Sequence, residues 1–313
     1  MRPPLRCPPG AAPGTEHLAY RITRKDRSLQ KAFRRIACEQ IDAALAELTA
    51  PQADPNEAIH QTRKHFKKLR GLLRLVRPGF DDYDRENAAI RDLAATLSGL
   101  RDTGALVETH DRLMVTAADG TRFDPVRAHL VARAPGGKAP LPLPEGFCDA
   151  LRALRDRASA WTLRGKDGAI LRAGLALTWA RAAAGYRAAS KDSSPANIHE
   201  WRKRVKYNWY HSRLLRDINK RRVQPHREAA KRLAGLLGEH HDIAVYLDEL
   251  DRLAQNALPA ITPALIADLK SRALDRKSRL EADALAIGAA MTYEKPGKLP
   301  KLWIRWWKDW RRG

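Results

Sequence analysis

The strongest constraint on the fold of this chain is a motif that occurs twice. The segments that begin at Ile59 and Ile198 both read I-H-x-x-R-K-x-x-K, at an offset of 139 residues. A second pair follows, LSGLRD from Leu97 and LGEHHD from Leu237, at an offset of 140 residues. Two separate pairs at nearly the same offset indicate an internal duplication. We therefore expect two similar units, one in each half of the chain.

Helical periodicity runs through nearly the whole sequence. The hydrophobic residues, 44% of the chain, are mostly Ala and Leu, which favour helix over sheet. Apolar positions recur at helical spacing, and Pro, Gly and Ser separate the periodic segments. The sequence therefore predicts an all-α protein in which each half forms one helical bundle. The predicted helices are 24–48, 56–76, 82–97, 103–115, 145–161, 169–189, 195–216, 224–237, 242–254 and 263–290.

Segments without this periodicity divide the chain into parts. Residues 1–16 are rich in Pro and Gly and are expected to form a flexible lead. Residues 119–143 combine Gly, Pro and basic residues with little period, which is typical of a linker. The first bundle is then expected over about 17–118 and the second over about 144–293. A tail rich in Trp and basic residues covers 294–313.

The charge of the chain narrows the class of partner. Lys and Arg number 58 against 36 Asp and Glu, which gives a formal charge of +22. Such a surface attracts polyanions, namely nucleic acid, polyphosphate or anionic lipid. No apolar stretch is long enough to predict a transmembrane helix, and the first residues lack the apolar core of a secretory signal. The three widely spaced cysteines predict neither a disulfide framework nor a zinc site, so the cytoplasm is the expected compartment.

Each copy of the repeated motif predicts an amphipathic helix with one basic face. At 100° per residue, the His, Arg and Lys side chains of the motif share one side of each helix. Between His60 and Arg77 there are seven Arg and Lys residues and no acid, and between His199 and Arg216 there are six, with Glu200. The first basic ridge consists of His60, Arg63, Lys64, Lys67, Arg70 and Arg74. The second basic ridge consists of His199, Arg202, Lys203, Lys206 and Arg213.

These two ridges favour a phosphate polymer over a solvated charged face. Exposed helices usually mix both signs of charge, and a ridge of one sign repels itself unless an anion screens it. Arg63 to Arg74 span about 17 Å of helix axis, which suits a linear chain of phosphates better than one small ligand. We expect His60 and His199 to hydrogen-bond phosphate rather than to act in acid–base catalysis. His65 lies on the opposite side of its helix and is expected to be packed.

The paired motifs resemble the CHAD family, the conserved histidine α-helical domain. This resemblance covers about residues 17–293 and implies two four-helix bundles related by a pseudo-twofold axis. The tail, which the resemblance does not cover, is expected to add an extra C-terminal helix. It also implies that the protein binds inorganic polyphosphate without catalysis, in a basic groove between the two bundles. A cytoplasmic location at polyphosphate granules is expected with this function. The residues that the resemblance assigns to binding are His60, Arg63, Lys64, Lys67, His199, Arg202, Lys203 and Lys206. Tyr207 and Tyr210 stand where the first copy has Lys68 and Gly71, which leaves the relative contribution of the ridges open.

Two other classes of function remain to be weighed. Nucleic acid is the alternative partner, because backbone contacts dominate the affinity for any phosphate polymer, although no recognition helix or zinc finger is found. An enzyme acting on phosphate would need an acidic metal-binding cluster or a nucleophile–base pair, and neither lies on the basic faces. The sequence therefore predicts no catalytic residue, no cofactor and no metal site.

Two smaller features allow more than one interpretation. Arg101-Asp102 and His241-Asp242 occupy matching positions, and a helix cap is favoured there over orientation of a phosphate-binding cation. In the tail, four Trp residues recur at helical spacing with basic residues on the other side. Docking of this helix on the bundle, a membrane-surface anchor and a partner contact all remain open for it.

Overall fold

In the computed structural model, the described residues are 20–50, 55–97, 102–115, 120–133, 143–256, 258–292 and 297–313. Over these residues the chain is helical and contains no strand, which confirms the predicted all-α class. The predicted lead, residues 1–16, lies outside the described residues, as do residues 119 and 134–142 of the predicted linker. The helices are α1 Leu29–Thr49, α2 Pro55–Val76, α3 Tyr83–Thr96, α4 Asp102–Met114, α5 Asp124–Arg133, α6 Phe147–Ala160, α7 Asp167–Lys191, α8 Pro195–Leu214, α9 Lys220–Ala254, α10 Pro263–Thr292 and α11 Lys298–Arg312, with short 3-10 turns at Arg24–Asp26, Arg77–Gly79 and Gly120–Phe123.

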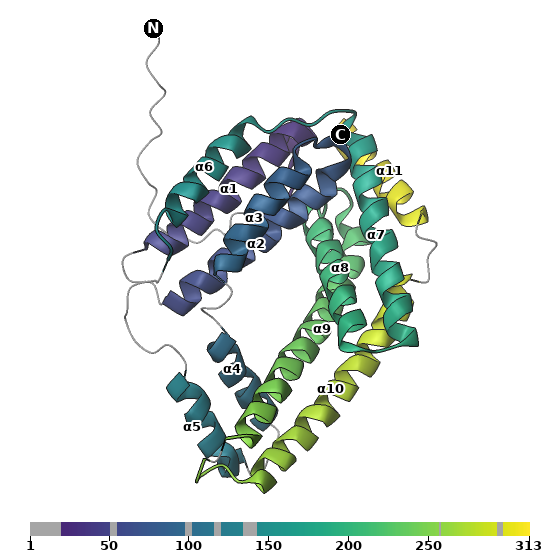
Figure 1. The fold of residues 1–313 in the computed structure, drawn as a ribbon. Helices are drawn as coiled ribbons and strands as arrows, with labels where there is room; N and C mark the ends of the chain where they lie inside the picture. Colours follow the sequence, from purple (N-terminus) through teal and green to yellow (C-terminus); the bar gives the residue numbers. More distant parts are fainter. Residues whose placement is uncertain are drawn as a thin grey trace.

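The helices follow one another around an oval outline (Figure 1). At one end, α1 packs between α2 and α6, and α3 lies against α2. Along one side, α8 packs against both α7 and α9, and α11 covers α7. At the opposite end, α9 and α10 form a long helical hairpin that reaches α4 and α5.

Three clusters of buried apolar residues hold this arrangement together. The largest joins α1, α2, α3 and α6 to parts of α7, α8 and α11, with the ring centroids of Phe33, Phe80 and Trp161 5.1–5.3 Å apart. The second joins α4 and α5 to α9 and α10 around Tyr246. The third joins α7, α8, α9 and α10 around the fully buried Trp201. Hydrophobic burial thus links helices from both halves of the sequence.

Two segments differ from their sequence-based expectation. The predicted break between helices 224–237 and 242–254 is wrong, because α9 runs without interruption from Lys220 to Ala254. The buried positions Leu237, His240 and Ile243 continue one apolar side across the expected break. In the segment predicted as a linker, residues 120–133 form a 3-10 turn and α5. The division of the chain into two duplicated four-helix bundles stays a prediction.

The C-terminal helix α11 docks on the rest of the protein. Trp303 and Trp307 are each only 3% exposed and belong to the largest buried cluster, whereas Trp306 and Trp310 are half-buried at its edge. Among the three interpretations of the tail, the structure agrees with docking on the bundle. Within the described residues, no helix combines the length and the apolar character needed to cross a membrane.

Gly174 marks the tightest approach between two helices. A Cβ atom at this position of α7 would meet the backbone carbonyl of Leu75 in α2, with the Leu75 carbonyl carbon only 2.8 Å away. Backbone cannot move aside as a side chain can, so we expect Gly174→Ala to lower the free energy of unfolding by about 3 kcal/mol. Urea unfolding would measure the change.

Gly235→Ala is the matched control for this prediction. Gly235 lies on the exposed side of α9, and a Cβ atom there would meet nothing within 4 Å. Replacing it with Ala should leave stability unchanged or raise it by about 1 kcal/mol, because Ala favours helix over Gly. Equal stabilities of the two variants would contradict the packing seen between α2 and α7.

Candidate anion-binding site

The crossing of α2 and α8 brings the two basic ridges together. The His211 Nε2–H of α8 donates to the Gly71 carbonyl oxygen of α2 at 3.0 Å. Gly71 also lies against Tyr210, since a Cβ atom on it would be 3.1 Å from the Tyr210 Cβ. A side chain at this position would require the neighbouring tyrosines to shift by a few tenths of an ångström, which glycine avoids. Gly71 and Tyr210 hold the same place in the two copies of the motif, so the helices meet at matching positions.

In the first ridge, Arg70 and Arg74 contact neutral groups and therefore keep their positive charge. All six of its side chains are half-buried on α2. The Arg70 Nε–H donates to Asn87 Oδ1 of α3 at 3.1 Å, and Arg74 stacks over the ring of Tyr207 in α8 at 4.3 Å. An amide and an aromatic ring orient these two guanidinium groups without neutralising them.

The second ridge is less uniform. Arg202 is half-buried, and this burial lowers its pKa, whereas the carboxylate of Asp242 in α9 opposes that shift. The Arg202 Nε atom has no hydrogen-bond partner among the described residues. Lys203, in contrast, is exposed and forms an ion pair with Glu200 at 3.3 Å. Each of these two cations therefore has one acidic neighbour, but only Arg202 is partly desolvated.

Helix α9 contributes a histidine to the second ridge. The His241 ring lies 5.1 Å from the His199 ring. Burial, Arg202, His199 and Lys206 lower the pKa of His241 to about 4, and burial with Lys203 and Arg202 lowers the pKa of His199. The expected helix cap at His241-Asp242 is wrong, because both residues lie in the middle of α9. In the sequence, the only sign that His241 has a role beside the ridge is that His241-Asp242 matches the position of Arg101-Asp102 in the first copy.

Lys68 is a further cation that the helical pattern of the ridge did not include. Burial, Arg213 and Lys64 lower its pKa to about 8. Arg213 reaches this place from α8, with its guanidinium group 5.4 Å from the ring of Tyr20, and the Tyr20 hydroxyl donates to the Lys68 carbonyl oxygen at 2.6 Å. Neighbouring cations repel one another, and a bound anion would reduce this repulsion.

Four arginines converge beside the other end of the helix contact. Arg74, Arg77, Arg181 and Arg204 line one small cavity together with Tyr207. Burial and the three neighbouring arginines lower the pKa of Arg181. Arg181 comes from α7, so sequence reasoning about the repeated helices alone could not find it. Arg204 carries an ion pair with Glu200, which reduces its share of the charge.

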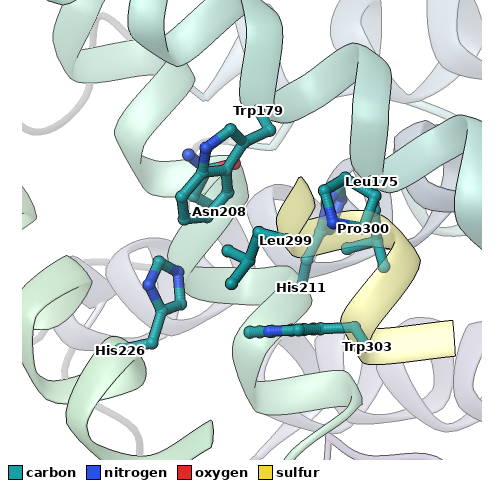
Figure 2. A pocket seen from close by; sticks show the side chains of 8 residues that line it. All are labelled: Leu175, Trp179, Asn208, His211, His226, Leu299, Pro300 and Trp303. Carbon is teal, nitrogen blue, oxygen red and sulfur yellow. The ribbon is translucent and has the colours of Figure 1, made fainter. Parts of the chain in front are cut away.

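A different pocket, shown in Figure 2, is lined mainly by apolar and aromatic side chains, with no Arg or Lys among the described residues that line it. It lies between α7, α8, α9 and α11, where the His226 ring stands 4.6 Å from Trp179 and 5.4 Å from Trp303. Burial lowers the pKa of both His211 and His226 to about 4, so both are neutral at pH 7. In the part of the chain that the structure describes, no group of three or more His, Cys, Asp or Glu could hold a metal ion.

Known proteins provide an independent comparison. A family model described as the CHAD domain matches residues 35–251. The crystal structure of the CHAD domain from the plant Ricinus communis superimposes with a TM-score of 0.65 at 20% sequence identity, over 91% of this chain and 98% of that chain. A comparison with curated proteins found no match. At this identity, the structural similarity shows a shared fold.

Proposed function

Because this chain belongs to the CHAD domain family, we propose that its two basic ridges bind inorganic polyphosphate without catalysis. The observation that carries this proposal is the crossing of α2 and α8, where cations of both ridges come together around Gly71 and Tyr210. A linear polymer with one negative charge or more per phosphate can follow both ridges through this crossing. We further propose that the protein is cytoplasmic and associates with polyphosphate granules.

Partial burial of cations on and beside the ridges supports tight binding. Arg202 and Lys68 have already lost much of their hydration in the folded protein, as their lowered pKa values indicate. A phosphate that binds there meets cations in a medium of lower effective dielectric, where charge-assisted hydrogen bonds are stronger and less screened by salt. Arg grips phosphate oxygens through two N–H groups, and Lys adds a compact point charge.

Binding is also expected to change the protonation of His199. Burial and neighbouring cations lower its pKa in the free protein. A phosphate chain beside it favours the imidazolium, which donates from both ring nitrogens. His60 holds the matching position in the first ridge. Both histidines would therefore act as hydrogen-bond donors to phosphate in the complex.

The arrangement of acidic residues supports binding without catalysis. Near the second ridge, Glu200 forms ion pairs with Lys203 and Arg204, and Asp242 faces Arg202. These carboxylates are spread over α8 and α9 and each is matched by a cation. Phosphoryl transfer through metal ions would instead need carboxylates grouped at one place.

The aromatic residues beside the ridges argue against nucleic acid as the main partner. Tyr207 lies under Arg74, Trp209 lies under Arg213, and Tyr210 is buried at the helix crossing. Proteins that bind single-stranded nucleic acid offer open aromatic faces on which bases stack. These rings are occupied by protein groups, so a polymer of phosphates without bases fits the surface better.

Calorimetric titration with long-chain polyphosphate at moderate salt tests the proposed function. We expect saturable binding whose affinity falls with salt by a logarithmic slope of about 0.7 for each phosphate contact. A tenfold excess of single-stranded DNA, counted in phosphates, should fail to displace the chain. Absence of binding at moderate salt, with no heat at two temperatures, would refute polyphosphate binding, and full displacement by DNA would favour the nucleic-acid alternative.

A further inference from the structure

A second cationic surface adjoins the ridges beyond Arg213. It consists of two neighbouring hollows that share Arg21, Asp217 and Lys220, where the N-terminal segment meets the turn between α8 and α9. Arg216 and Arg227 complete the first hollow, and we call the whole surface the Arg216 hollow. The second hollow extends to the half-buried Trp310 of α11.

The Arg216 hollow has a large excess of positive charge. Its single lining carboxylate, Asp217, forms an ion pair with Arg21 at 3.2 Å. Six cations line it: Arg21, Arg24, Lys25, Arg216, Lys220 and Arg227. Like charges gathered in this way destabilise the folded state unless an anion screens them. Burial and the neighbouring arginines Arg21, Arg227 and Arg213 also lower the pKa of Arg216.

Direct contacts connect this surface to the ridges. The guanidinium group of Arg213 lies over the ring of Tyr20, the residue that precedes Arg21. Tyr20 in turn donates to the backbone of Lys68 on α2. Arg216 follows Arg213 by three residues, in the turn after α8, and the two guanidinium groups are close enough for Arg213 to lower the pKa of Arg216. The positive surface therefore continues from α2 through Arg213 into the hollow.

We propose that the Arg216 hollow is an outer binding surface for the same phosphate chain, reached by linear polyphosphates too long for the ridges alone. This inference rests on the proposed function of the ridges. It predicts that the affinity for polyphosphate continues to rise when the polymer becomes longer than the part that the two ridges can hold. The ridges anchor the chain, and the hollow holds the part that extends past Arg213.

The test compares Lys220→Ala/Arg227→Ala with the unchanged protein, using tripolyphosphate and long-chain polyphosphate in separate titrations. Neither side chain lies on a ridge. We expect the variant to bind long chains about tenfold more weakly, with a salt slope smaller by about 1.4 for two lost contacts, and to bind tripolyphosphate within about twofold of the unchanged protein. Circular dichroism confirms that both proteins are folded.

Arg221→Ala/Arg222→Ala is the matched control. These two exposed residues of α9 carry the same charge and line neither hollow. Their loss should change the affinity for long chains by less than about twofold. Equal effects of the two variants would show that net charge alone matters and would overturn the hollow. If the unchanged protein binds long chains and Lys220→Ala/Arg227→Ala binds them equally well, only the hollow falls; if the unchanged protein binds none, the proposed function falls with it.

Discussion

Reversing the charge of the ridges should abolish polyphosphate binding. The variant combines Arg63→Glu, Lys67→Glu and Lys206→Glu with Arg202→Gln, because a Glu at the half-buried position 202 would face the carboxylate of Asp242. Each lost or reversed phosphate contact costs about 1 kcal/mol or more, so four together should weaken binding at least about a thousandfold. Titration calorimetry at moderate salt measures this loss.

A control with a similar change in net charge separates a specific site from general attraction. Arg172→Glu, Lys231→Glu, Arg232→Glu and Arg279→Glu change exposed positions of α7, α9 and α10 outside both ridges. We expect this protein to retain most of its affinity, with a loss below about tenfold from the weaker overall field. A loss as large as that of the ridge variant would mean that polyphosphate has no fixed site on this protein.

Stability should fall steeply when the pH drops below 6.5. His65 and His211 are buried and His226 is half-buried, and burial lowers the pKa of all three to about 4, against 6.5 for an exposed histidine. Between these values the unfolded chain binds more protons than the folded one, so acidification favours unfolding. The free energy of unfolding is highest at a pH above 6.5. By pH 5, protonation of each of these histidines in the unfolded chain lowers it by about 2 kcal/mol.

Unfolding in urea at pH 7.5 and pH 5 measures this effect. The His226→Phe variant keeps a ring between Trp179 and Trp303 but removes one titrating group. We expect the loss of unfolding free energy between pH 7.5 and pH 5 to be about 2 kcal/mol smaller than that of the unchanged protein, since one histidine with a pKa of about 4 is removed. Equal stability of the unchanged protein at pH 7.5 and pH 5 would contradict the burial of these side chains.

The sequence predicts local features of this protein well. The helical pattern of each motif places the ridge residues on one side of its helix, and it correctly predicts that His65 is packed, where it pairs with Gln40 at 3.0 Å. The all-α class follows from the same periodicity, since each helix carries its own apolar side. These features depend on residues close together in the chain, which is why periodicity is enough to find them.

Features that depend on contacts between distant helices could not be predicted. Lys68 joins the basic surface because Arg213 and Tyr20 lie beside it, and Arg181 does so because α7 packs against α2 and α8. The place of His241 beside the second ridge is not predicted, because a helix is expected to start after a break near Gly238, whereas α9 continues through this position. The buried side of α9 outweighs the weak helix propensity of one glycine.

The central claim is that a phosphate chain lies along α2 and α8 where the two helices cross. A crystal structure of the protein soaked with polyphosphate tests it most directly. The account predicts a row of phosphates within hydrogen-bond distance of Arg63 and Lys67 on one helix and of Arg202 and Lys206 on the other. An ordered chain on a different face of the protein, with both ridges left to solvent, would contradict it.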